Sequence, residues 1–206
     1  MSEPIGGQNV LTDEETRIIE RYLDRVASQS PVAPNHRCAL GYPGPWVASK
    51  IGPEYPAARL TGNAENDEAV RLIGEAYNRV RKLVEETYNR ELLMIHAIYT
   101  EISEGMGMGL HSDMYEVDGD LRDDNTATLL QYSAVLYLGT SGEDFTGGDL
   151  YFPNQDFRHK ATRGSAIYFR GDLEHLHDVE PVTGGARKGI TIFYGYKEQV
   201  LEAYPW

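Results

Sequence analysis

The hydrophobic periodicity of the sequence changes near residue 91, and this change limits the folds that the chain can adopt. Before it, residues 12 to 29 and 65 to 89 place apolar side chains at three- and four-residue steps, which is typical of amphipathic helices. After it, short runs rich in β-branched and aromatic residues alternate with glycine and polar clusters. Helices followed by many strands predict an α+β protein whose helices cover one face of the strand structure.

The first predicted helix should begin at a capping box. Thr12 and Glu15 have the spacing at which each side chain accepts a hydrogen bond from the backbone N–H of the other. Residues 31 to 63 contain six prolines and no repeating period, which predicts an irregular connection. Because no linker divides the sequence, we expect one domain over residues 1–206, with helical support from 1–90 and a strand-rich core over 91–200.

Charge and cysteine content exclude several classes of partner and site. The net charge is −13, so the surface should repel phosphate backbones, and nucleic acid is not an expected partner. Cys38 is the only cysteine, which excludes an internal disulfide and a thiolate zinc site. The start of the chain lacks a signal-peptide pattern, and the apolar runs are too short to cross a bilayer. We therefore expect a cytoplasmic protein without a membrane partner, and the sequence gives no signal for its oligomeric state.

The segment "LHSDMY", residues 110 to 115, carries His111 and Asp113 two positions apart. Residues i and i+2 of a strand point the same way, so both side chains could bind one ion. Two imidazoles and one carboxylate on one face of iron(II) leave three positions open for a chelating cosubstrate and oxygen. A third ligand must come from a distant strand, and His177 begins a β-rich run 64 residues after Asp113. His175 shares its face on a regular strand, so alternation alone does not separate the two histidines.

Arg187 lies ten residues after His177, on a strand face shared with Gly189, Thr191 and Phe193. If that face points inward, the arginine needs an anionic partner, because an unpaired buried charge is costly. A dicarboxylate ligand would supply one with bidentate geometry.

The run from residue 130 to 138 has two different faces. We expect the mixed polar face to form a cavity wall, where Tyr137 could donate its hydroxyl to the anion that Arg187 binds. We expect the apolar face to pack against the helices. The first face holds Gln131, Ser133, Val135 and Tyr137; the second holds Leu130, Tyr132, Ala134, Leu136 and Leu138. Elsewhere, His96 is expected in the core and His159 at the surface.

Five segments in order, "HSD", "YSAVLYLG", "FTGGDLYFP", "RGSAIYF" and "HDVEPVTGGAR", resemble the Fe(II)/2-oxoglutarate-dependent dioxygenases and among them the prolyl-hydroxylase group. The resemblance covers roughly residues 92 to 196. It implies a double-stranded β-helix (jelly-roll, cupin-like) core with the N-terminal helices packed on the major sheet. The context "H-x-V-x-P-V" and the spacing to Arg187 favour His177 over His175 as the third ligand.

The resemblance also implies roles for individual residues. The iron ligands would be His111, Asp113 and His177. The 2-oxoglutarate site would combine Arg187, Tyr137 and Thr191 at the distal carboxylate, Val135, Leu150 and Val179 along the methylenes, and Tyr99 near the metal-side carboxylate. From their positions in the sequence, Tyr115, Arg122 and His175 are candidate substrate contacts. The alternative for Arg122 is a salt bridge within its acidic loop, and the alternative for His175 is a position behind the metal ligands or at the rim of the site.

The implied reaction uses Fe(II), 2-oxoglutarate and O₂, with ascorbate as a possible reductant. It would decarboxylate 2-oxoglutarate to succinate and hydroxylate an aliphatic C–H of an amino acid, a peptidyl proline or an amino-acid-derived small molecule. Asp113 favours hydroxylation over halogenation, because related halogenases have no carboxylate at that position. Two alternatives remain: a desaturase or cyclase with the same site, and a non-catalytic jelly-roll module that binds a metal or a ligand.

Overall fold

The computed structural model describes residues 3–29, 38–40, 64–121 and 127–203. Most of the predicted irregular connection, and Arg122, lie outside the described residues. The helices are α1 (Asp13–Gln29), α3 (Ala64–Tyr88) and the short α4 (Lys197–Ala203). No described helix is long and apolar enough to cross a membrane.

The capping box at the start of α1 is confirmed. The backbone N–H of Thr12 donates to the Glu15 carboxylate at 2.8 Å, and the N–H of Glu15 donates to the Thr12 hydroxyl at 3.2 Å. Arg79 of α3 forms an ion pair with the same carboxylate at 3.2 Å. The first turn of α1 is thereby tied to α3.

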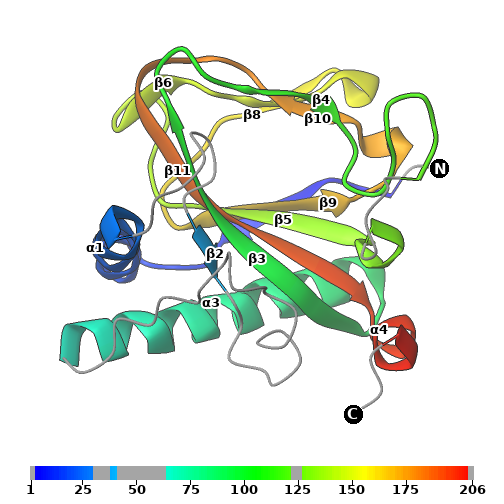
Figure 1. The fold of residues 1–206 in the computed structure, drawn as a ribbon, viewed down its shortest axis with the longest axis horizontal. Helices are drawn as coiled ribbons and strands as arrows, with labels where there is room; N and C mark the ends of the chain where they lie inside the picture. Colours follow the sequence, from blue (N-terminus) through cyan, green and yellow to red (C-terminus); the bar gives the residue numbers. More distant parts are fainter. Residues whose placement is uncertain (1–2, 30–37, 41–63, 122–126, 204–206) are drawn as a thin grey trace.

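Two antiparallel sheets form the core, and Figure 1 shows α1 and α3 on the side of the larger sheet that faces away from β4, β8 and β10. The larger sheet has the order β1 (Gly6–Asn9), β9 (Ser165–Arg170), β5 (Tyr132–Tyr137), β11 (Val182–Tyr196), β3 (Leu92–Ser103) and β2 (Cys38–Leu40), and β6 (Phe145–Gly147) also pairs with β11. The smaller sheet has the order β4 (Met108–His111), β10 (His177–Val179), β7 (Leu150–Phe152) and β8 (Phe157–His159). Three 3₁₀ helices complete the described elements: η1 (Ala127–Leu129), η2 (Pro153–Gln155) and η3 (Leu173–His175). This is the predicted α+β, double-stranded β-helix architecture.

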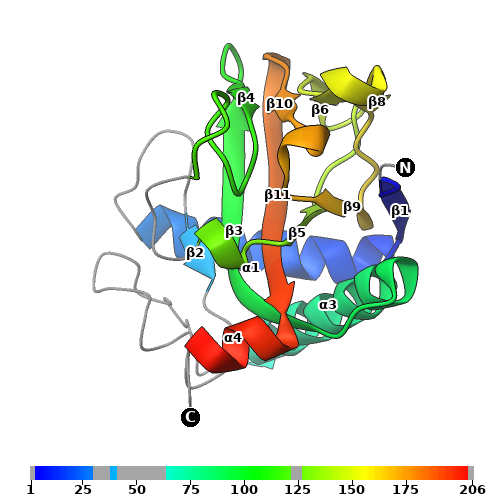
Figure 2. The ribbon, with the colours of Figure 1, turned by 90° about the vertical axis from the view of Figure 1, so that its right-hand side faces the viewer.

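The long strands β3 and β11 run side by side from the end near α4 to the end near β4 and β10 (Figure 2). Residues that lie opposite each other in an antiparallel pair share a face of the sheet. Arg187 is opposite Ile102 and Thr191 is opposite Ile98, so the even-numbered residues of β3 from His96 to Ile102 share the face that carries Arg187. This pairing decides which side chains of β3 can reach the interior.

The larger sheet buries each of its faces against a different partner. The outer face packs on α1 and α3, and contributes Tyr132, Ala134, Leu136 and Leu138 to that core. The inner face packs against the smaller sheet, and contributes Val135 and Tyr137. The two faces predicted for residues 130 to 138 are therefore confirmed for these side chains, and the interior face is available for a site.

Candidate active site

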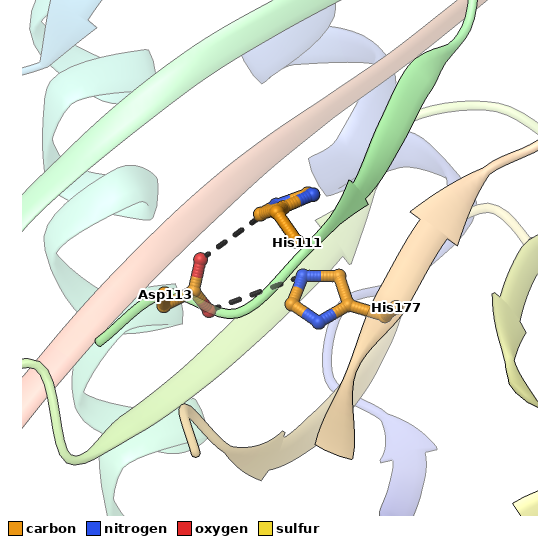
Figure 3. Close-up of side chains that lie close together, drawn as sticks. All are labelled: His111, Asp113 and His177. Carbon is orange, nitrogen blue, oxygen red and sulfur yellow. Dashed lines mark ion pairs between the residues drawn. The ribbon is translucent and has the colours of Figure 1, made fainter. Parts of the chain in front are cut away.

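His111, Asp113 and His177 converge between the two sheets. His111 ends β4 and lies directly opposite His177, the first residue of β10. One ligand atom from each of the three side chains lies within 4.8 Å of the other two (Figure 3). The Nε2 atom of His111 is 3.9 Å from Oδ1 of Asp113, and Nε2 of His177 is 4.0 Å from Oδ2. The pairing of β4 with β10 therefore brings together residues that are 64 or more positions apart in the sequence.

Both histidines are oriented by backbone carbonyls. The Nδ1 atom of His111 lies 2.7 Å from the carbonyl oxygen of Gly109, and that of His177 lies 3.0 Å from the carbonyl oxygen of His175. A carbonyl can only accept, so the proton of each neutral ring sits on Nδ1. Each Nε2 is left with its lone pair directed to the centre of the cluster, as in histidines that bind metals.

The Asp113 carboxylate is held from the opposite wall by Ser133 of β5. The Ser133 hydroxyl donates a short hydrogen bond to Oδ2 of Asp113, and both residues are buried. A Cβ atom at Gly171 would lie 3.3 Å from Cβ of Asp113, so the backbone there approaches the ligand closely. Sequence reasoning placed Ser133 on the cavity wall but gave it no role.

The electrostatics of this cluster suit a metal ion. The pKa of His177 is lowered to about 4. Burial is the largest cause and outweighs the Asp113 carboxylate, which raises the pKa, while neighbouring His111 lowers it further. The ring is therefore neutral near pH 7, which metal binding requires. Two imidazoles and one carboxylate, with the second nitrogen of each ring hydrogen-bonded, match the donor set of non-haem iron(II) sites. The residues present fit an iron(II) ion.

A cavity lies beside the three donors and extends to Arg187. Its walls include the expected side chains Thr191, Val135, Leu150 and Val179. The lining thus joins a metal-binding cluster to an apolar channel with a cation in it. This composition is typical of a site for a small organic anion with an apolar middle.

Arg187 is 2% exposed and forms no ion pair with any described residue. Its guanidinium donates to the Tyr137 hydroxyl at 3.4 Å and lies 5.1 Å from the centre of that ring. Its Nε atom is buried without a hydrogen-bond partner in the described part of the chain. The charge of Arg187 acts on the Asp149 carboxyl, whose pKa it lowers against the larger effect of burial, but the two side chains form no ion pair. A buried cation without an ion-pair partner is costly, and a ligand carboxylate would supply one.

Gly148 gives the Arg187 side chain its space. Its φ is +68°, a conformation that favours glycine, and a Cβ there would lie 3.1 Å from Cδ of Arg187 and 3.0 Å from Cγ2 of Val182. Gly148, two residues before β7, therefore borders the Arg187 cation.

The expectation that Tyr99 lies near the metal-side carboxylate is wrong. Tyr99 is opposite Ile190 on the outer face of the larger sheet, packs in the core against the helices and donates its hydroxyl to Asp24 at 3.2 Å. Its sequence neighbours Ile98 and Thr100 line the cavity instead. The predicted residue is thus one position away from the residues that line the cavity. A shift of one position along a strand places a side chain on the other face of the sheet.

His175 does not face the cavity as a substrate contact, contrary to expectation. It is 1% exposed, with Nδ1 2.8 Å from the Asp172 carboxylate and Nε2 2.9 Å from the carbonyl oxygen of Glu3. Burial lowers its pKa, but the hydrogen bonds to Asp172 and Glu3 raise it above its usual value overall. Both ring nitrogens are therefore engaged, and the role of His175 is to hold the segment whose carbonyl orients His177.

The remaining substrate predictions concern the segment after Asp113. Tyr115 is half-buried against an apolar cluster that includes Met114 and Leu129, and it remains a prediction. Arg122 lies outside the described residues. The segment around His111 exposes four apolar side chains, Met106, Leu110, Val117 and Leu121. It also exposes four acidic ones, Glu104, Glu116, Asp118 and Asp120.

Comparison with known proteins places this geometry in a family. Residues 95–195 match the 2OG-Fe(II) oxygenase superfamily. A relative from Xenopus tropicalis, 2-oxoglutarate and iron-dependent oxygenase domain-containing protein 3, is 24% identical over 135 residues, which cover 63% of this chain. That stretch spans 42% of the relative, less than half of its length.

Solved structures share the fold. A viral collagen prolyl hydroxylase from Paramecium bursaria Chlorella virus-1, in complex with 2OG, has a TM-score of 0.63 and 14% identity, over 93% of this chain and 95% of that one. A prolyl hydroxylase from Trichoplax adhaerens, in complex with a hypoxia inducible factor peptide fragment, has a TM-score of 0.61 and 15% identity, over 96% and 86% of the two chains. The chain therefore belongs to the 2OG-Fe(II) oxygenase superfamily, within which its fold is prolyl-hydroxylase-like.

Proposed function

We propose that this protein is an Fe(II)- and 2-oxoglutarate-dependent dioxygenase. Its reaction hydroxylates an aliphatic C–H of an amino acid, a peptidyl proline or an amino-acid-derived small molecule, and converts 2-oxoglutarate to succinate. One observation carries the proposal: a single cavity has the His111, Asp113 and His177 donors in its wall and, beside them, the buried Arg187, which forms no ion pair with a described residue. A ligand with one end on a metal and a carboxylate at the other end satisfies both features.

The three donors would hold iron(II) and leave coordination positions for the cosubstrate and O₂. When bound, the iron supplies the activation of O₂ that drives decarboxylation of 2-oxoglutarate and oxidation of the substrate, with ascorbate as a reductant that maintains the Fe(II) state. Asp113 would fill one ligand position of the iron with its carboxylate, so that this position is not open to a halide. This favours hydroxylation among the reactions of such sites.

The cavity walls would fix the cosubstrate in one orientation. Arg187 and Tyr137 would bind the distal carboxylate, with Thr191 as a further hydroxyl donor from the same strand as Arg187. Val135, Leu150 and Val179 would pack on the methylenes. An apolar channel of this kind excludes water from the reacting end, which limits side reactions.

The surroundings of His111 support a peptide or a small organic substrate. Exposed apolar side chains at Leu110 and Leu121 could contact apolar parts of a substrate, and the exposed acidic residues disfavour a polyanion. The Trichoplax adhaerens prolyl hydroxylase of similar fold was solved with a peptide. A proline-containing peptide is thus the first substrate class to examine.

The test is succinate formation by the purified protein supplied with Fe(II), ascorbate, O₂ and 2-oxoglutarate. Free amino acids and proline-containing peptides serve as candidate acceptors, and mass spectrometry records the product. The proposal expects succinate release that an acceptor stimulates, with a matching product that has gained one oxygen atom. An Asp113→Ala variant should lose both signals. If iron and 2-oxoglutarate bind while no succinate forms with any acceptor, the protein is a binding module and the proposal fails.

A further inference from the structure

We propose that His159 completes the binding site for the distal carboxylate of 2-oxoglutarate, where its Nε2–H donates a hydrogen bond to that carboxylate directly or through one water molecule. The inference rests on the proposed function and adds a residue to it. Sequence reasoning placed His159 at the surface, whereas the structure places it between the sheets, next to Tyr137.

The position of His159 on β8 directs its side chain into the interior. His159 lies opposite Leu150 of β7, and residues opposite each other share a face of the sheet. Leu150 lines the cavity, so His159 is on the cavity side of the smaller sheet. The preceding residue, Arg158, points to the other side, where its guanidinium lies 3.9 Å from the centre of the Tyr151 ring.

His159, Tyr137 and Arg187 form one contiguous group from three strands. The imidazole of His159 stacks on the Tyr137 ring, with ring centres 5.4 Å apart and planes 24° apart. The Tyr137 hydroxyl in turn accepts the hydrogen bond from Arg187. The positive charge of Arg187 also acts on His159. Burial is the larger cause of the lowered pKa of the imidazole, and the charge of Arg187 lowers this pKa further.

Two buried nitrogen atoms in this group have no hydrogen-bond partner among the described residues: Nε2 of His159 and Nε of Arg187. Leaving such atoms unsatisfied costs free energy, so both call for a partner that the described side chains do not provide. The two atoms belong to side chains that both contact Tyr137. A carboxylate accepts hydrogen bonds at up to four positions and could satisfy Arg187, Tyr137 and His159 together.

A neutral histidine suits this place better than another cation would. Burial and the charge of Arg187 hold the pKa of His159 below its usual value, so the ring stays neutral at physiological pH. It then offers one N–H donor without adding a second positive charge to a buried site. The expected result is selectivity for 2-oxo acids that carry a distal carboxylate.

The test compares two ligands that differ only at that end. 2-Oxopentanoate has the five-carbon chain of 2-oxoglutarate without the distal carboxylate. Each is titrated calorimetrically into Mn(II)-loaded protein, because Mn(II) occupies the site without turnover. His159→Phe keeps a ring against Tyr137 and removes the donor, and we expect it to weaken 2-oxoglutarate binding roughly 10- to 100-fold. Binding of 2-oxopentanoate should stay as in the unmutated protein.

Two further variants complete the design. His159→Gln retains an N–H donor and should recover part of the lost affinity for 2-oxoglutarate. This variant also provides a test of the donor if His159→Phe does not fold. Arg158→Gln, at the adjacent position facing outward, is the matched control and should leave both affinities unchanged. Equal weakening of both ligands by His159→Phe, or unchanged 2-oxoglutarate affinity, would overturn the inference. Failure of the unmutated protein to bind 2-oxoglutarate would instead overturn the proposed function.

Discussion

The Ser133 hydroxyl donates a hydrogen bond to Oδ2 of Asp113 and so joins β5 of the larger sheet to the metal-binding cluster of the smaller one. Asp113 follows β4, and its carboxylate would otherwise be free to rotate about the side-chain bonds. With Oδ2 held by Ser133, Oδ1 stays on the side of His111. A neighbour that orients a ligand in this way is expected to raise metal affinity.

Ser133→Ala should therefore weaken metal binding by about 10- to 100-fold, because the carboxylate loses its orienting donor. The measurement is a calorimetric titration of the metal-free protein with Mn(II). Ser141→Ala, in the turn after β5 and away from the cluster, is the matched control and should bind Mn(II) like the unmutated protein. Equal Mn(II) affinity in the two variants would show that the hydrogen bond does not orient the ligand.

Gly148→Ala should reduce the affinity for 2-oxoglutarate, because the new Cβ would displace the Arg187 side chain. Gly142→Ala separates this effect from backbone strain: Gly142 also has a positive φ, of +88°, but a Cβ there meets nothing within 4 Å. Both variants should lose about 1 kcal/mol of stability to the unfavourable φ. Only Gly148→Ala should weaken 2-oxoglutarate binding to the Mn(II)-loaded protein. An equal loss of 2-oxoglutarate affinity in Gly142→Ala would show that backbone strain, and not displacement of Arg187, causes the effect.

Tyr99→Phe should leave 2-oxoglutarate affinity unchanged, since the Tyr99 hydroxyl bonds to Asp24 on the helix side of the larger sheet. The lost hydrogen bond should lower the free energy of unfolding by about 1 kcal/mol. Thr191→Val, on the cavity side, should show the opposite pattern, with weaker cosubstrate binding and little change in stability. Urea unfolding and calorimetric titration of both variants test this. Weakened cosubstrate binding in Tyr99→Phe would show that the Tyr99 hydroxyl contributes to the cosubstrate site.

Glu15→Gln should destabilise the protein in a pH-dependent way. The hydrogen bond from the Thr12 backbone lowers the pKa of Glu15 most, burial raises it, and Arg79 lowers it further. A carboxyl whose pKa is lowered on folding stabilises the protein above its unfolded pKa, and that contribution is lost as the pH falls through the folded pKa. Glutamine keeps the capping hydrogen bond but loses the charge, so we expect a cost of about 0.5–1 kcal/mol near pH 7.

The difference in the free energy of unfolding between the Glu15→Gln variant and the unmutated protein should shrink as the pH falls through the lowered pKa of Glu15, where Glu15 itself becomes protonated. Urea unfolding of both proteins at a series of pH values measures it. A difference that stays constant from pH 7 to pH 3 would mean that the Glu15 charge does not stabilise α1.

Periodicity predicted the helices and the strand faces well because these depend on neighbours along the chain. The apolar stripe and the capping box place α1 and α3 to within a residue. The alternation of residues 130 to 138 separates the face that meets the helices from the face that meets the cavity.

Tyr99 shows where periodicity stops being informative. Alternation gives two faces for β3 but does not say which one points inward; the pairing of Thr191 with Ile98 decides it. Ser133, His159 and His175 depend on contacts with distant residues in the same way. His175, for example, bonds to the backbone of Glu3, 172 residues away. Contacts of this kind exist only after the sheets have closed around the cavity.

The central claim is that one cavity binds iron(II) and 2-oxoglutarate together, with Arg187 on the distal carboxylate. Anaerobic addition of 2-oxoglutarate to the Fe(II)-loaded protein tests it directly, because a cosubstrate that chelates the iron gives a visible charge-transfer band. We expect the band in the unmutated protein, no band in His177→Ala, and a band that needs far more 2-oxoglutarate in Arg187→Ala. If iron is bound to the unmutated protein and 2-oxoglutarate produces no band, the claim is contradicted.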